Sequence, residues 1–264
     1  MLTEVKNQFK VTLLSIKYSL MREMLNKAAF ISNIVFMMLN NACFIIQWVI
    51  LFSIKDNIGG CDLKDIFLIW GLAASTYGVA HFFFNNAFDL SECINTGVLD
   101  TYIVQPKNVL ISAITSKISV SAIGDFIYGY IMLILYGITF KNFILFTLFS
   151  ITGGIVMAMF AVILGSLSFW FSKTDTLVEV GNNLVTNFAT YPEGIFKGIV
   201  KYVLYFIVPV GIINFIPLTI IMKFSLMNFI IILMVIILII ILAFIIFYQG
   251  LKRYSSTNLM NVRI

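Results

Sequence analysis

The stretch FIIILMVIILIIILAFIIF, residues 229–247, contains no charged side chain, hydroxyl group or amide group. Its length matches the ~20 apolar residues that an α-helix needs to cross ~30 Å of hydrocarbon. The whole chain of 264 residues is 61% hydrophobic and 11% charged, whereas soluble domains are about 25% charged. We therefore predict an all-α integral membrane protein.

Five further apolar segments have a similar length, so the chain is predicted to form a single transmembrane domain, 1–264, with six transmembrane helices. The predicted spans are residues 29–54, 66–84, 110–137, 143–170, 198–222 and 229–248. Pro209 and Pro217 interrupt the fifth span, and each proline removes a backbone donor. This proline-broken span is either a simple kink or ends in a short re-entrant piece at the outer interface.

Residues 1–27 are predicted to form a helix on the membrane surface. Apolar residues recur there at steps of three and four, bordered by lysines, which is typical of an interfacial helix. The apolar face consists of Val5, Phe9, Leu13, Ile16 and Leu20. With this helix inside, the predicted cytoplasmic segments hold thirteen of the 17 Lys and Arg residues, including Lys173, Lys197 and Lys201. The positive-inside rule then places both termini in the cytoplasm, with 249–264 as a tail.

The sequence contains none of the common catalytic or nucleotide-binding motifs. It has no GxxxxGK[ST] phosphate loop, no HExxH and no GxSxG. The single histidine argues against a His-based metal site, and the three cysteines form no CxxC pair. The net charge of +5 follows the membrane topology, so it does not indicate nucleic acid as a partner. We expect no enzyme activity, and we expect the energy for any transport to come from another chain.

Few polar residues inside the predicted spans attract a functional interpretation. Asp125, in the third span, is interpreted either as a group on a translocation path or as a residue hydrogen-bonded across helices or placed near the outer interface. His81 is interpreted as structural. The small-residue pairs Gly154/Ala158 and Ala161/Gly165 permit close helix approach, within one subunit or between two.

The segment DLSECINTGVLDTYIVQPKN, residues 89–108, is acidic and lies between two apolar spans. Leu90, Ile94 and Val98 repeat every four residues, which predicts a short amphipathic helix on the cytoplasmic side. Asp89 stands where a helix cap is expected, and the helix is expected to end near Gly97. Such a helix, held between two spans, offers a docking surface on which a soluble partner could act.

Three sequence marks occur in order along the chain. They are Gly97-Val98-Leu99-Asp100 followed by Pro106, then Tyr191-Pro192 with Ile195-Phe196, and FIVPVGIINFIP over 206–217. With these marks the chain resembles, over essentially its whole length, the ABC-2-type permeases, the membrane subunits of ATP-binding-cassette exporters, and more narrowly a bacterial branch of them. Two positions depart from the pattern. Gln105 stands where relatives often have a basic residue, and Phe215 stands where tyrosine is frequent.

The resemblance implies a role for the 89–106 loop and a set of partners. The loop would contain the coupling helix that docks on the ATPase, with Glu92 and Asp100 facing that partner. The implied docking residues are Asp89, Leu90, Glu92, Ile94, Gly97, Leu99, Asp100 and Pro106. Two ATPase subunits would carry ATP and Mg²⁺, with no cofactor on this chain, and a second permease subunit, identical or related, would complete the complex in the bacterial cell membrane.

The resemblance also implies a translocation path between two permease subunits. Spans two and five would supply most of it, with Ser75, Tyr77 and Asn214 as candidate path residues beside Asp125. Two other functions stay open from the residues alone. One is an ATP-independent membrane immunity or binding protein, and the other is a secondary carrier. The substrate is not encoded in any motif of the chain.

Overall fold

The fold is all-α, as predicted. The computed structural model describes residues 2–171 and 174–255, and no β-strand occurs in these ranges. The long helices are α1 (Leu2–Glu23), α2 (Lys27–Ile54), α3 (Leu63–Phe83), α7 (Ser121–Gly137), α8 (Phe140–Ser166), α9 (Asp175–Ala189) and α12 (Leu226–Leu251). The shorter helices are η1 (Asn85–Ala87), α4 (Leu90–Asn95), α5 (Asp100–Ile103), α6 (Val109–Ile114), η2 (Leu167–Phe169), η3 (Glu193–Ile195), α10 (Ile199–Phe206), η4 (Gly211–Phe215) and α11 (Ile216–Met222).

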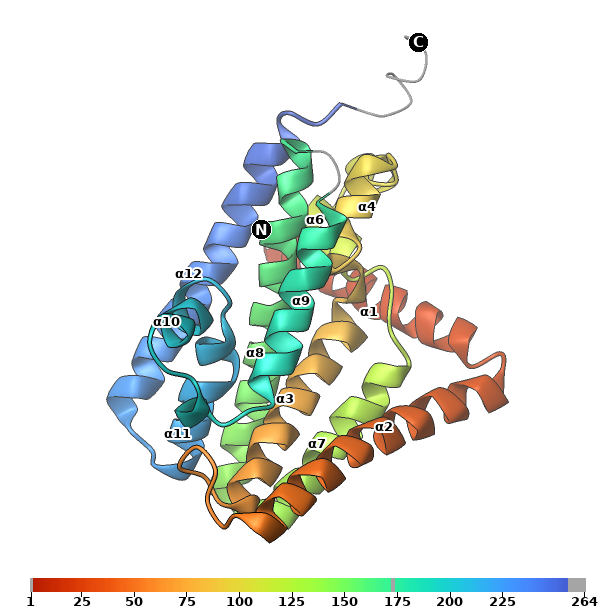
Figure 1. The fold of residues 1–264 in the computed structure, drawn as a ribbon. Coiled ribbons are helices and arrows are strands. Elements are labelled where there is room, and N and C mark those ends of the chain that lie inside the picture. Colours follow the sequence, from red (N-terminus) through yellow and green to blue (C-terminus); the bar gives the residue numbers. More distant parts are fainter. Residues whose placement is uncertain (1, 172–173, 256–264) are drawn as a thin grey trace.

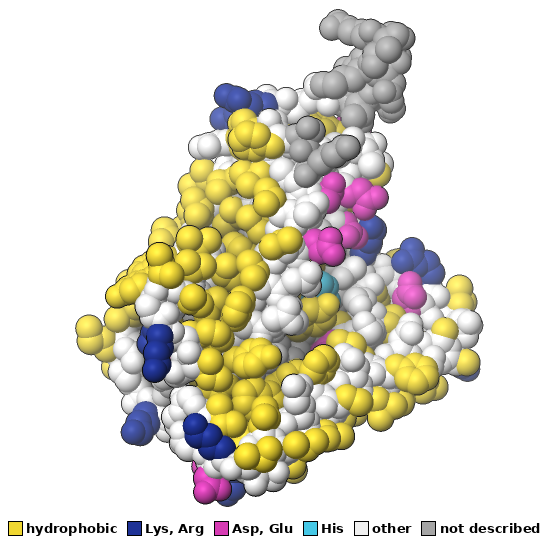
Figure 2. Space-filling view, in the orientation of Figure 1, with side chains coloured by type: hydrophobic (Ala, Val, Ile, Leu, Met, Phe, Trp, Pro, Cys, Tyr) yellow, Lys and Arg dark blue, Asp and Glu magenta, His cyan; other side chains and the backbone are white. Residues whose placement is uncertain are grey.

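Four of these helices are long and apolar enough to cross a membrane. They are α2, α3, α8 with its extension η2, and α12, and they coincide with four of the predicted spans, with ends shifted by a few residues. Much of α2 and α12 is exposed on the outside of the bundle, and Figure 2 shows a broad apolar surface on this side of the molecule. A surface of this kind suits contact with lipid chains.

The predicted third span, 110–137, is not one continuous helix. The structure ends α6 at Ile114 and begins α7 at Ser121. The connection is rich in hydroxyl side chains, which compete for backbone hydrogen bonds. Thr115 Oγ1 donates to the carbonyl of Ile111 (2.7 Å), and the Ser119 amide donates to the carbonyl of His81 (3.0 Å). These bonds turn the chain beside the end of α3 and shorten the apolar helix to α7.

A second correction concerns the segment between the predicted fourth and fifth spans, which was expected to be a cytoplasmic loop. α9 runs along α8 and α3, from the end that carries α4 toward the opposite end (Figure 1). Thr174, just before α9, bonds to Ser91 of α4 (3.0 Å), whereas Tyr191, just after α9, packs its ring on Trp48 of α2 (5.6 Å between ring centroids). The segment was missed because its amide and hydroxyl side chains lower its hydropathy.

The predicted fifth span, 198–222, is broken as expected. Its two halves, Ile199–Phe206 and Gly211–Met222, meet at 77° around Pro209. α10 begins after η3, which packs against Gly59, and α11 ends near Phe224, whose ring lies 5.4 Å from Lys141 Nζ at the start of α8. Both ends of the pair therefore lie at the end of the bundle opposite α4, which favours the re-entrant alternative over the simple kink.

This arrangement places two lysines, Lys197 and Lys201, at the other end of the bundle from the one predicted. Lys197 and Lys201 now lie with Lys55, Lys64, Lys141 and Lys223 at the end opposite α4. Of the Lys and Arg residues that the structure describes, nine then lie toward the end that carries α4 and six toward the opposite end. Lys173 and Arg263, which were counted among the thirteen predicted cytoplasmic residues, lie outside the described residues.

Cysteine labelling tests this placement. In a variant whose three cysteines, Cys43, Cys61 and Cys93, are replaced by serine, we expect Lys197→Cys to react with a membrane-impermeant maleimide on the same side as Lys141→Cys. Thr101→Cys, in the 89–106 loop, is expected to react only from the other side. Labelling of Lys197→Cys from the same side as Thr101→Cys would contradict the placement of α9 and of the broken segment 199–222.

The native Cys61 lies in the connection between α2 and α3, where its thiol is partly buried. Burial, with the nearby Asp65 and Asp62 carboxylates, raises the pKa of the Cys61 thiol to about 11. Because the thiolate is the reactive form, Cys61 is expected to label slowly at pH 7.5 and faster as the pH approaches 11. A labelling rate independent of pH between 7 and 10 would contradict this environment.

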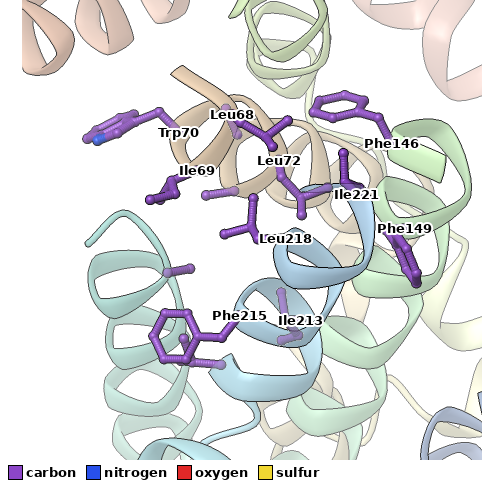
Figure 3. Packing of buried hydrophobic residues seen from close by; sticks show 14 of the residues in the cluster. Leu68, Ile69, Trp70, Leu72, Phe146, Phe149, Ile213, Phe215, Leu218 and Ile221 are labelled. Carbon is purple, nitrogen blue, oxygen red and sulfur yellow. The ribbon is translucent and has the colours of Figure 1, made fainter. Parts of the chain in front are cut away.

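The core is built around α3, which is the most buried of the long helices. Figure 3 shows Leu68 and Leu72 of α3 facing Phe146 and Phe149 of α8, with Leu218 of α11 closing the layer. The small-residue pairs of α8 are also inside the subunit. A Cβ at Gly154 would lie 2.6 Å from Val79 of α3, and one at Gly165 would lie 3.2 Å from Leu90. Of the two alternatives, packing within one subunit is therefore the one observed.

Helix α1 docks on the rest of the chain through its polar side. The side chain of Gln8 donates to Ser112 Oγ (3.3 Å) and accepts from the Asn108 amide (3.0 Å). Ser15 Oγ donates to the carbonyl of Thr115 (3.4 Å). The apolar residues Phe9 and Leu13 are 64% and 50% exposed, and they line a hollow beside Phe83 and Ile111. Polar contacts to the protein together with exposed apolar side chains suit a helix lying in the lipid interface.

Candidate functional site

The 89–106 loop lies at one end of the bundle and is tightly packed on it. Leu90 and Ile94 of α4 are buried, as their spacing predicts. The predicted third member, Val98, is 45% exposed. Gly97 has φ +79, a left-handed conformation that ends the helix. This turn brings Leu99, which is fully buried, to the inner face in place of Val98.

Polar side chains fix the loop to α8 and α9. Ser91 Oγ is 2.5 Å from Ser168 Oγ, which follows α8, and 3.0 Å from Thr174 Oγ1, which precedes α9. The Asn86 side chain donates to the carbonyl of Ala113 (2.8 Å). Both apolar burial and hydrogen bonds therefore fix the loop to these helices.

Asp89 occupies the N-cap position of α4, but its side chain does not cap the helix. Asp89 Oδ2 accepts instead from Lys117 Nζ (3.0 Å), and this bond raises the pKa of Lys117. The pair is largely exposed, so it contributes little to stability. Since the folded pKa is raised, that small contribution is present at neutral pH and is lost as the pH rises through the Lys117 pKa.

The outward surface of the loop combines polar and aliphatic side chains. Glu92, Thr96, Thr101 and Pro106 are exposed, and Val104 is 81% exposed. Asp100 is half-buried, and it interacts with Tyr254 beyond α12, whose pKa is raised by burial and by the hydrogen bond with Asp100. Of the two predicted ATPase-facing carboxylates, Glu92 thus faces outward and Asp100 also serves a contact within the chain.

A cleft of about 260 Å³ opens between α2, α3 and α9. Its polar wall carries amide and hydroxyl side chains: Asn40, Asn41, Gln47, Asn182, Asn183, Thr186, Asn187 and Thr190. Its aromatic residues are Phe44, Trp48, Trp70, Tyr77 and Tyr191. These amides were not predicted as site residues. Asn33, Asn40 and Gln47 recur every seven residues along an apolar helix, a spacing that places amides on one face of α2.

The structure brings two of the four predicted path residues together in this cleft. Tyr77 and Asp125 both line it. Ser75 does not; it is fully buried against Gly129. Asn214 is also fully buried, and its side chain donates to the carbonyls of Ala189 and Ile69. The predicted path roles of Ser75 and Asn214 stay predictions, without support from their positions.

Asp125 combines two of the interpretations offered for it. It is 2% exposed, and its Oδ1 accepts from the side chain of Asn41 on α2 (2.7 Å), the cross-helix hydrogen bond expected for a structural role. Its Oδ2 has no hydrogen-bond partner among the described residues, although Asp125 lines the cleft. Asp125 is in the second turn of α7, near the end that carries α4, and this position does not favour the outer-interface interpretation.

A second hollow lies between the 89–106 loop and the first half of α9. It is lined by Phe88, Asp89, Glu92, Asp175, Val178, Glu179 and Asn182, and Asn182 also lines the cleft. Figure 2 shows acidic side chains grouped near this end of the molecule. No group of three or more His, Cys, Asp or Glu side chains within the described ranges is arranged to hold a metal ion.

A column of stacked rings lies beside the junction of the two hollows. The ring of His81 is 4.0 Å from those of Tyr77 and Phe88, and its Nδ1 is 3.0 Å from Asn85 Oδ1. These contacts agree with the structural interpretation of His81. They also hold Tyr77 at the cleft and Phe88 at the acidic hollow.

Comparison with known proteins identifies the class. Residues 35–258 match the family described as ABC-2 family transporter protein. Because the match covers most of the chain, the protein belongs to this family, and it is a multi-pass membrane protein with an ABC permease role. Comparisons with curated proteins and with solved structures give no significant match.

Proposed function

We propose that this chain is the permease subunit of an ATP-driven exporter that couples to separate ATPase subunits through the 89–106 loop. The observation that carries the proposal is the form of this loop. Its inner face is anchored on the bundle by Leu90 and Leu99, while Val98 and Val104 are exposed at the end of the molecule. Exposed aliphatic residues on a rigid mount suit a protein partner.

The anchoring also suggests how the coupling works. Leu90 packs on Gly165 of α8, and Ser91 bonds to Thr174 at the start of α9. Movement of the loop would therefore displace α9, which forms one wall of the cleft. ATP binding on two ATPase subunits would shift the population between two arrangements of the cleft, by the difference in nucleotide affinity between them.

The polar wall supports a second permease subunit, identical or related. The side chains of Asn40, Gln47, Asn183 and Asn187 are exposed on α2 and α9, at the depth of apolar helices. Amides facing lipid lose their hydrogen bonds to water, which is costly. A partner subunit over this face would enclose the amides in an aqueous path. Six helices, α2, α3, α7, α8, α9 and α12, would then cross the bacterial cell membrane in each subunit, with both termini in the cytoplasm.

Co-purification tests the proposal. The tagged chain is purified in mild detergent after expression with its neighbouring genes, and the amount of phosphate-loop ATPase is measured. We expect the wild type to retain the ATPase and Val104→Asp to retain at least ~10-fold less. Ile195→Asp, an exposed aliphatic position at the opposite end, is the matched control and is expected to behave like the wild type.

Two results would count against the proposal. If Val104→Asp retains as much ATPase as Ile195→Asp, the loop surface is not the docking site. If no ATPase accompanies the wild type, the chain works as an ATP-independent membrane binding protein or as a secondary carrier.

A further inference from the structure

The charged groups that line the cleft and the adjoining hollow all have one sign. Asp125 is the charged residue of the cleft. The hollow adds Asp89, Glu92, Asp175 and Glu179. Within the described residues, no Lys or Arg lines either space. The described cation nearest to this set is Lys117, which is paired with Asp89.

Asp125 points to a ligand independently of the acidic hollow. Its side chain is almost completely buried, and one carboxylate oxygen lacks a hydrogen-bond partner in the part of the chain that the structure describes. Leaving a carboxylate oxygen buried without a partner is costly. A cation in the cleft would supply the missing interaction and would favour the ionised form of the carboxyl group.

The aromatic side chains favour an organic cation over a metal ion. Trp48, Trp70, Phe44 and Tyr77 line the same cleft as Asp125, and the rings of Phe44 and Trp70 are stacked at 5.5 Å. Aromatic faces attract organic cations and bury their apolar portions. Amide side chains of α2 and α9 in the same cleft offer neutral hydrogen-bonding groups. An anion would find no charged partner here and would be repelled by the carboxylates.

We propose that the exported substrate is a small organic cation with an apolar or aromatic body. The acidic hollow collects it from the end that carries the 89–106 loop, and it binds between the aromatic wall and Asp125. This inference rests on the proposed function, and it adds the charge and chemical class of the substrate.

A matched pair of hydrophobic ions tests the sign of the charge. Tetraphenylphosphonium and tetraphenylborate have nearly the same size and shape but opposite charges, so their partition into detergent and their fit differ mainly through charge. Binding of each ion is measured by equilibrium dialysis on the purified permease–ATPase complex. We expect tetraphenylphosphonium to bind at least ~10-fold more tightly than tetraphenylborate.

Variants of Asp125 assign the binding to the cleft. Asp125→Asn keeps the size and an acceptor for Asn41 but removes the charge, so we expect a ~10-fold loss of tetraphenylphosphonium affinity. Asp125→Glu keeps the charge and is expected to restore most of it. Asp56→Asn, an exposed carboxylate in the connection between α2 and α3, is the control that should change nothing.

Two outcomes would overturn the inference. One is equal binding of the two ions by the wild type. The other is full tetraphenylphosphonium affinity in Asp125→Asn while that variant still elutes as an intact complex. Because ATPase co-purification is measured on the same samples, either result would refute the substrate class and leave the proposed function standing.

Discussion

Gly129→Val is expected to destabilise the protein by about 3 kcal/mol, the largest effect of any single substitution considered. α3 makes its most extensive contacts with α7, and glycines let the two backbones meet. A Cβ at Gly129 would lie 2.5 Å from the carbonyl oxygen of Gly71. Because that oxygen belongs to the backbone of α3, no side-chain rotation relieves the clash, and the helices have to separate.

The control for this substitution is Gly165→Ala on α8. A Cβ there would lie 3.2 Å from the nearest atom, a side-chain carbon of Leu90, so a shift of a few tenths of an ångström accommodates it. The thermal stability of both variants is measured in detergent. Wild-type stability of Gly129→Val would show that α3 and α7 are farther apart than described.

Asn214→Leu is expected to cost about 2 kcal/mol, because it removes a buried side chain that bonds to two backbone carbonyls. Those carbonyls belong to Ala189 at the end of α9 and Ile69 of α3. Asn214 thereby fixes the broken segment 199–222 to both helices. Leucine has the same number of side-chain heavy atoms but no donor, so the carbonyl of Ala189 would lose this bond.

Asn183→Leu is the matched control, since Asn183 is exposed in the cleft and its loss leaves no buried group without a partner. We expect Asn214→Leu to lower the unfolding temperature clearly and Asn183→Leu to leave it nearly unchanged. Loss of transport with an unchanged unfolding temperature in Asn214→Leu would contradict the structural role and would support the path role implied by the sequence resemblance.

The long apolar helices were predictable because hydropathy alone defines them. α2, α3, α8 and α12 each contain enough consecutive apolar residues to span a bilayer. α9 was not predictable in this way, since its polar side chains face the cleft and lower its mean hydropathy. Polar groups have to lie away from lipid, so the polar side chains of α9 line the cleft. The same side chains keep α9 from being predicted by hydropathy.

The candidate site was predicted in part. A lone carboxylate in an apolar segment identified Asp125, and the position of Tyr77 on the second span identified a second lining residue. The partners of Asp125 depend on which helices meet, as the Asn41 hydrogen bond shows, and no local pattern gives that. In the 89–106 loop, the fourfold spacing predicted Leu90 and Ile94 correctly. Because of the left-handed turn at Gly97, Leu99 is buried at the position where the spacing predicted Val98.

The most direct test of the account is the nucleotide dependence of solvent access to the cleft. Asn183→Cys, in the cysteine-free variant of the permease–ATPase complex in membrane vesicles, is labelled with a hydrophilic methanethiosulfonate reagent applied from each side. The control is Leu238→Cys on α12, which is 62% exposed and faces lipid in this account, so it should stay unlabelled.

We expect Asn183→Cys to react from the side that carries the 89–106 loop without nucleotide, and from the opposite side when ATP and vanadate trap the ATPase. Such a change of side would show that the amide-lined cleft is a translocation path driven by ATP. Labelling at the same rate and from the same side in both nucleotide states would contradict the account.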